Sequence, residues 1–97
     1  MKLNYMNQNN RTDKRISLQK ECILGDQFSW IDTQTIDVSK NGIGVKTDKT
    51  LPFKSGCELD VYIAGMARFP RAKLMWTKTD FNNTTRLGLK FFANILD

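Results

Sequence analysis

The sequence contains no histidine, which is the side chain most often used for acid–base catalysis near neutral pH. It also lacks a glycine-rich loop leading into a helix, so the usual cradle for a nucleotide phosphate is missing. The carboxylates are scattered, and no two are placed for shared acid–base work. We therefore expect that the protein is not an enzyme.

Cysteine is scarce as well. The only two, Cys22 and Cys57, stand in apolar stretches, where free thiols behave as small core residues in a reducing compartment. Two thiols without histidine cannot make an ordinary structural zinc site. We expect no metal and no cofactor.

Long apolar runs are absent, so no membrane span is expected. The first ten residues are polar and rich in asparagine, unlike a signal peptide. This pattern predicts a cytoplasmic protein with a flexible segment over 1–10 and one folded domain over 11–97. Lys and Arg outnumber Asp and Glu by 15 to 10, for a net charge of +5. Such a domain attracts anions, including phosphates, nucleic acid and acidic lipids.

Alternation of apolar and polar residues is the dominant pattern and predicts β-strands. It favours a buried face with Trp30, Ile36 and Val38 in one strand, and with Ala72, Leu74 and Trp76 in a later one. Asn41-Gly42 predicts a hairpin between two strands, because both residues tolerate positive φ. About six short strands, spaced by roughly ten residues, predict an all-β antiparallel barrel. The end of the chain, 93–97, has room for a short helical stub at most.

Two short motifs are candidates for binding chemistry. Arg11 and Arg15 form an Arg-x-x-x-Arg motif, which alone is typical of a solvated basic segment. Asp37, Ser39 and Gly42 form an Asp-x-Ser-x-x-Gly motif, which alone is typical of a capped hairpin.

Together and in this order, the two motifs resemble the signature of the PilZ family. Lys73 to Trp76 resembles the family's late strand, Leu87 to Phe91 resembles its closing strand, and the resemblance spans residues 11–92. Many members continue into a C-terminal helix, of which only a stub remains here. The resemblance implies a six-stranded antiparallel barrel of PilZ type that binds cyclic di-GMP. It assigns the ligand to five residues, namely Arg11, Arg15, Asp37, Ser39 and Gly42.

The chemistry of these side chains suits the ligand. An arginine fork can hold a phosphate bidentately, grip guanine O6 and N7, or stack on the base. Asp37 can accept from the guanine N1–H and N2–H₂ groups, Ser39 can bond phosphate or base, and Gly42 lets backbone approach the ligand. We expect the Trp76 side chain to be buried in the core, and stacking on the ligand is the alternative. Some members of the family carry another arginine just before the first motif and hold a stacked pair of ligands. Asn10 occupies that position here, so the resemblance implies one ligand per chain.

The expected function is a receptor that relays the signal to an unidentified downstream protein by ordering its Arg-x-x-x-Arg segment. Two alternatives remain open. One is a PilZ-like adaptor that no longer binds the nucleotide. The other is a single-stranded nucleic-acid-binding barrel, which is disfavoured because most aromatics stand on apolar faces or in turns.

Overall fold

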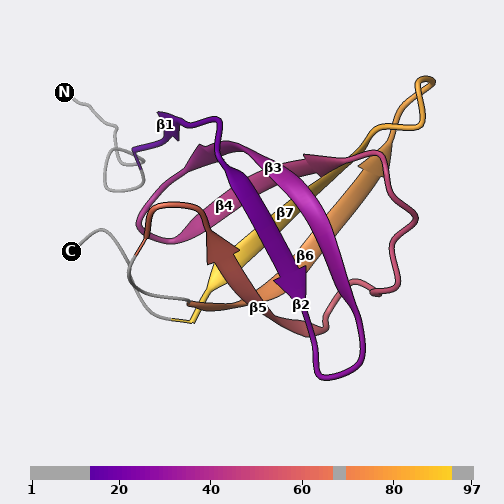
Figure 1. Ribbon diagram of the computed structural model, residues 1–97. Coiled ribbons are helices and arrows are strands. Elements are labelled where there is room, and N and C mark those ends of the chain that lie inside the picture. The colour runs from indigo at the N-terminus through magenta and orange to yellow at the C-terminus, as the bar shows by residue number, and fades with distance from the viewer. Residues whose placement is uncertain (1–13, 67–69, 93–97) are drawn as a thin grey trace, which may run out of the picture.

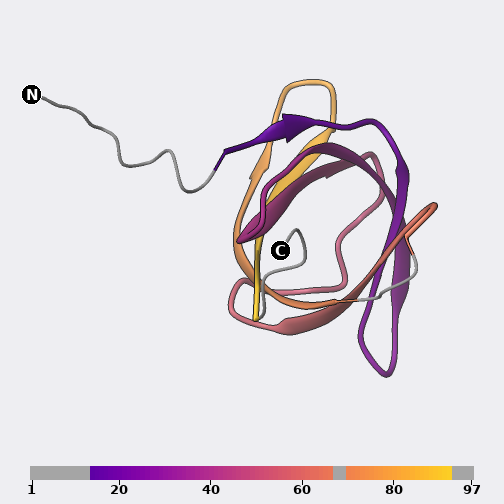
Figure 2. The ribbon, with the colours of Figure 1, turned by 90° about the vertical axis from the view of Figure 1, so that its left-hand side faces the viewer.

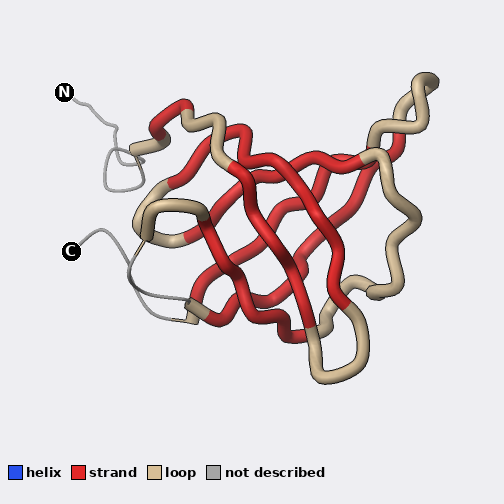
Figure 3. Tube along the Cα trace, in the orientation of Figure 1, coloured by secondary structure: helices blue, strands red, loops and turns tan. Residues whose placement is uncertain are grey.

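The computed structural model describes residues 14–66 and 70–92. Within these ranges the chain forms strands and loops only, as Figure 3 shows. The strands are β1 (Ile16–Ser17), β2 (Glu21–Gly25), β3 (Trp30–Val38), β4 (Gly42–Thr47), β5 (Glu58–Ile63), β6 (Arg71–Thr79) and β7 (Thr85–Phe91). The predicted flexible segment, Arg11 and the predicted helical stub lie outside the described residues.

Six antiparallel strands close into a barrel in the order β3, β2, β5, β6, β7, β4, with β4 pairing back onto β3. Figure 1 shows β2 and β3 crossing in front of β4, β7 and β6, and Figure 2 shows the strands enclosing a ring. The short β1 pairs only with the end of β3, where Ser17 lies opposite Asp37. The predicted six-stranded antiparallel barrel is confirmed, and its closure protects the strand edges.

The barrel interior is filled by side chains from all six long strands. The largest that are fully buried include Leu24, Ile43, Leu59, Leu74 and Leu87. Both cysteines are free thiols, with Cys22 buried in this core. None of the described residues forms a helix that could span a membrane.

Strand β3 buries the opposite face from the one that its sequence predicts. Ile31, Thr33 and Thr35 point inward, whereas Trp30 is 53% exposed and covers Gly25. The buried threonines are tolerated because each hydroxyl donates to a backbone carbonyl, Thr33 to Cys22 at 2.8 Å and Thr35 to Leu18 at 2.6 Å.

A bulge then changes the alternation in β3. The pairing with β4 shifts between Thr35 and Asp37, so Val38 returns to the core while Ile36 is only partly buried. The prediction that Trp30, Ile36 and Val38 share one buried face is therefore correct for Val38 alone.

Strand β6 contains a second bulge. Leu74 pairs with Leu89 and Trp76 pairs with Gly88, which leaves Met75 as an extra residue. Met75 and Trp76 are consequently both on the outside, at 48% and 51% exposure. The prediction that Trp76 is buried with Ala72 and Leu74 is wrong, because the extra residue reverses the alternation that it assumed.

Candidate functional site

The two bulges lie at opposite ends of one row of residues across four neighbouring strands. Asp37 on β3 is opposite Gly44 on β4, Gly44 is opposite Gly88 on β7, and Gly88 is opposite Trp76 on β6. The two central positions carry no side chain. We call Gly44 and Gly88 the glycine floor, with a carboxylate at one end and an indole at the other.

Both end residues lean over this floor. A Cβ atom added at Gly44 would lie 2.9 Å from Oδ1 of Asp37. A Cβ atom added at Gly88 would overlap the indole of Trp76. A larger residue at either position would displace the neighbouring side chain that occupies the space above the glycine.

Arg15 brings the first motif to the same place. Its Nη1 donates to Oδ1 of Asp37 at 3.0 Å, and both side chains are partly exposed, at 49% and 33%. The pairing of β1 with the end of β3 holds Arg15 close to Asp37. The structure thus joins one residue of each predicted motif, 22 positions apart in sequence, in a single ion pair.

Ser39 and Gly42 occupy a different environment. Ser39 is fully buried, and its Oγ accepts from the backbone amides of Asn41 at 3.3 Å and Gly42 at 3.2 Å. Among the described residues, positive φ occurs at Gly56, Gly65 and Asn83, so Asn41 and Gly42 do not use the positive φ that both tolerate. The hairpin forms nonetheless, because the Ser39 amide donates to the Gly42 carbonyl at 2.9 Å.

Gly42 is required by packing between strands. A Cβ atom there would overlap the backbone carbonyl oxygen of Leu89 on β7. In this conformation Ser39 caps the turn that follows Asp37, and Gly42 lets β4 approach β7. The turn would have to rearrange before the Ser39 hydroxyl could contact a ligand directly.

A shallow pocket of about 240 Å³ opens over the glycine floor. Its polar and aromatic lining comes from Arg15, Asp37, Trp76 and Arg86, while Ile36, Ile43, Leu87 and Leu89 line it with Gly44 and Gly88. Our sequence reasoning missed Gly44, Gly88 and the outward position of Trp76. The sequence did contain a pattern that indicates the two glycines. Each stands between two apolar residues of an alternating strand, in Ile43-Gly44-Val45 and Leu87-Gly88-Leu89, where a solvent-facing side chain is expected.

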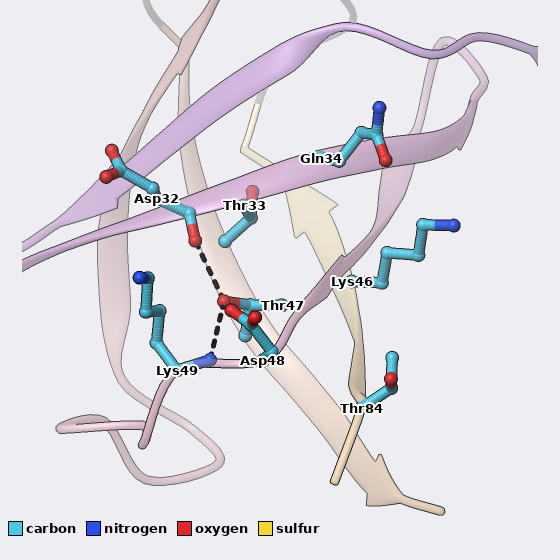
Figure 4. A pocket seen from close by; sticks show the side chains of 8 residues that line it. All are labelled: Asp32, Thr33, Gln34, Lys46, Thr47, Asp48, Lys49 and Thr84. Atoms are coloured by element: carbon cyan, nitrogen blue, oxygen red, sulfur yellow. Dashed lines mark hydrogen bonds between the residues drawn. The ribbon is translucent and has the colours of Figure 1, made fainter. Parts of the chain in front are cut away.

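A second hollow, of about 380 Å³, lies elsewhere on the barrel and is drawn in Figure 4. It is lined by Asp32, Thr33, Gln34, Lys46, Thr47, Asp48, Lys49 and Thr84, and it contains no motif residue. The Thr47 hydroxyl there donates to the Asp32 carbonyl at 2.8 Å and accepts from the Lys49 amide at 3.1 Å. We take the glycine floor as the candidate site instead, because Arg15 of one motif and Asp37 of the other meet there.

No cluster of three or more His, Cys, Asp or Glu side chains occurs within residues 14–66 and 70–92. The site offers a cationic fork, a carboxylate and an indole, which together suit a flat, anionic, hydrogen-bonding ligand.

Comparison with known proteins agrees with this description. The sequence matches the PilZ domain family over residues 9–97. The chain therefore belongs to the PilZ domain family. No curated protein sequence matches it.

Two solved structures share the fold. The PilZ domain with c-di-GMP of YcgR from Escherichia coli has a TM-score of 0.69 at 20% identity, over 87% of this chain and 79% of that one. The Bacillus subtilis inhibitor of motility MotI/DgrA has a TM-score of 0.71 at 18% identity, over 91% of this chain. Our chain spans only 45% of the Bacillus protein.

Proposed function

We propose that this protein is a cytoplasmic, non-catalytic receptor that binds cyclic di-GMP over the glycine floor. The observation that carries the proposal is the ion pair between Arg15 and Asp37, which joins one residue of each motif beside the two floor glycines. Membership of the PilZ family, and the cyclic di-GMP present in the similar YcgR domain, support the choice of ligand.

Each side chain at the floor has a distinct task in this proposal. The indole of Trp76 stacks on one guanine, since the residue is 51% exposed and its ring lies over Gly88. Asp37 accepts from the N1–H and N2–H₂ groups of a guanine, which adenine does not offer in that form. Arg15 turns its fork from Asp37 to a phosphate or to guanine O6 and N7. Arg11 supplies the second fork, and Ser39 and Gly42 hold the hairpin that presents Asp37.

Binding also provides a route for signalling. In the free protein the positive charges of Arg11, Lys14 and Arg15 repel one another, and a bound anion removes that repulsion. We infer that the ligand orders this segment on the barrel, with one ligand per chain, and that a downstream protein reads the ordered surface.

Calorimetric titration of the whole chain with cyclic di-GMP tests the proposal, with cyclic di-AMP and GTP as controls. We expect one ligand per chain and a strong preference for cyclic di-GMP, because Asp37 reads the guanine edge. Equal affinity for the two cyclic dinucleotides would overturn the role of Asp37. No binding at all would favour the adaptor, and comparable binding of a short single strand at moderate salt would favour the nucleic-acid alternative.

A further inference from the structure

Three cations lie directly opposite one another across three neighbouring strands. Lys46 on β4 pairs in register with Arg86 on β7, and Arg86 pairs with Lys78 on β6. Directly opposite residues of an antiparallel sheet project from the same face. That face is the outer one, because the flanking residues Val45 and Leu87 are fully buried. We call Lys46, Arg86 and Lys78 the cationic ladder.

The cationic ladder lacks compensating carboxylates. Within residues 14–66 and 70–92, salt bridges join Arg15 to Asp37 and Arg71 to Glu58 and Asp60, but none involves the ladder. Figure 4 shows the Lys46 side chain extending away from the carboxylates of Asp32 and Asp48. Like charges directly opposite each other destabilise a sheet. The ladder therefore opposes folding, and a bound anion would reverse that effect.

The cationic ladder borders the glycine floor. Lys46 follows Gly44 by two positions on β4, and Arg86 precedes Gly88 by two on β7, so the two rows are neighbours on one face. Two residues along a strand span roughly 7 Å, which is within the reach of a long side chain. Arg86 already lines the pocket that contains Arg15, Asp37 and Trp76.

We propose that the cationic ladder is a phosphate subsite of the cyclic di-GMP site. This inference rests on the proposed function and deepens it. The ligand carries two phosphodiester groups, and Arg15 can serve only one end of the floor. With one guanine stacked on Trp76, the phosphate on the Arg86 side of the floor lies over the ladder. Arg86 contacts that phosphate directly, and Lys46 and Lys78 act through their charge.

The test is titration of cyclic di-GMP into the wild type and three variants, Arg86→Gln, Lys46→Gln and Lys78→Gln. We expect Arg86→Gln to weaken binding about tenfold and each lysine change about threefold. A charged hydrogen bond contributes more to the binding free energy than a screened charge that makes no direct contact. Arg86→Lys should retain most of the affinity, since a lysine ammonium can also contact a phosphate as a point charge. The dependence of Kd on salt should become shallower in all three glutamine variants.

Lys54→Gln is the matched control, because Lys54 is exposed in a loop and lines none of the pockets described above. It should bind like the wild type. Thermal unfolding adds a second measurement. Without ligand, Arg86→Gln should melt slightly above the wild type, because the change removes cross-strand repulsion.

The outcomes separate the two proposals. If the wild type fails to bind cyclic di-GMP, both the proposed function and the phosphate subsite are overturned. If the wild type binds and the three ladder variants all bind like Lys54→Gln, the subsite alone is overturned. If Arg86→Lys binds as poorly as Arg86→Gln, Arg86 grips the guanine edge with its fork and the phosphate assignment is wrong.

Discussion

At the scale of single residues, Arg15 links the two motifs, because it belongs to the first and forms an ion pair with Asp37 of the second. Its ion pair with Asp37 is partly exposed, and such pairs contribute only about 0–1 kcal/mol to stability. We predict that Arg15→Ala weakens cyclic di-GMP binding at least tenfold, or roughly 1.4 kcal/mol, while the barrel stays folded. Calorimetry and thermal unfolding measure the two effects.

Arg15→Lys provides the matched comparison for this prediction. Lysine keeps the charge but lacks the fork, so we expect weak binding here too, in contrast to Arg86→Lys. Normal affinity in either Arg15 variant, or loss of the fold, would show that the division between scaffold and site is wrong. Arg11→Ala is expected to behave like Arg15→Ala.

The buried thiol of Cys22 predicts how the free energy of unfolding depends on pH. Burial raises the pKa of its thiol from an ordinary 9.0 to about 11, and a hydrogen bond with Thr33 partly opposes this rise. Between pH 9.0 and about pH 11, the Cys22 thiol loses its proton in the unfolded chain but keeps it in the folded chain. The free energy of unfolding should therefore fall as the pH rises, by roughly 1.4 kcal/mol per unit from this group.

Urea unfolding of Cys22→Ala from neutral pH to about pH 10.5 isolates this contribution, because the substitution removes the thiol and the linked slope. We expect a shallower decline than in the wild type. Cys57→Ala should change the slope less, since Cys57 is only partly buried. Parallel slopes for the wild type and Cys22→Ala would contradict the assigned cause.

At the scale of strands, the two bulges and the two floor glycines build the site together. The bulge in β6 turns Trp76 outward, and Gly88 leaves the space that its indole occupies. We predict that Gly88→Ala displaces the indole and weakens cyclic di-GMP binding at least fivefold, or about 1 kcal/mol, while the barrel remains folded. The displaced group is the exposed end of a side chain, so little packing is lost.

Gly42→Ala, in contrast, should lower the stability of the fold. Its added methyl group meets the backbone carbonyl oxygen of Leu89, which cannot move without disturbing the pairing of β4 with β7. We expect a loss of roughly 1–3 kcal/mol in unfolding free energy, as in other overpacked sites. Chemical denaturation of Gly42→Ala and Gly88→Ala, alongside titration, distinguishes the two. Equal destabilisation of both variants would contradict this division.

At the scale of the whole molecule, the proposed signal passes through the segment that precedes the barrel. β1 contains two residues and pairs only with β3, so its opening should cost little free energy. We predict rapid trypsin cleavage after Arg11, Lys14 and Arg15 in the free protein and slow cleavage in the complex. Cleavage within the barrel should be slow in both states.

Ordering several residues costs roughly 1–2 kcal/mol each in backbone entropy, so the affinity should be moderate. Lys40 is a useful internal reference for the digest, because it lies in the hairpin that Ser39 already caps. Equal cleavage of the segment with and without cyclic di-GMP would mean that the ligand does not order it.

The sequence alone determined the architecture and the motif residues. Period-two alternation bounded by turn residues predicts a small antiparallel barrel, because each strand has one face to bury. The two short motifs identify the family because they carry residue types and spacing that do not depend on knowing the fold.

Tertiary structure alone decided which side chains meet at the site. Bulges after Thr35 and after Leu74 reverse the alternation in β3 and β6, and the second turns Trp76 outward. A bulge leaves no mark in a local pattern of apolar residues. The pairing of Gly44 with Gly88, and of Lys46 with Arg86 and Lys78, depends on the register between strands far apart in sequence. Register follows from how all six strands close together, so no local stretch of the chain encodes it.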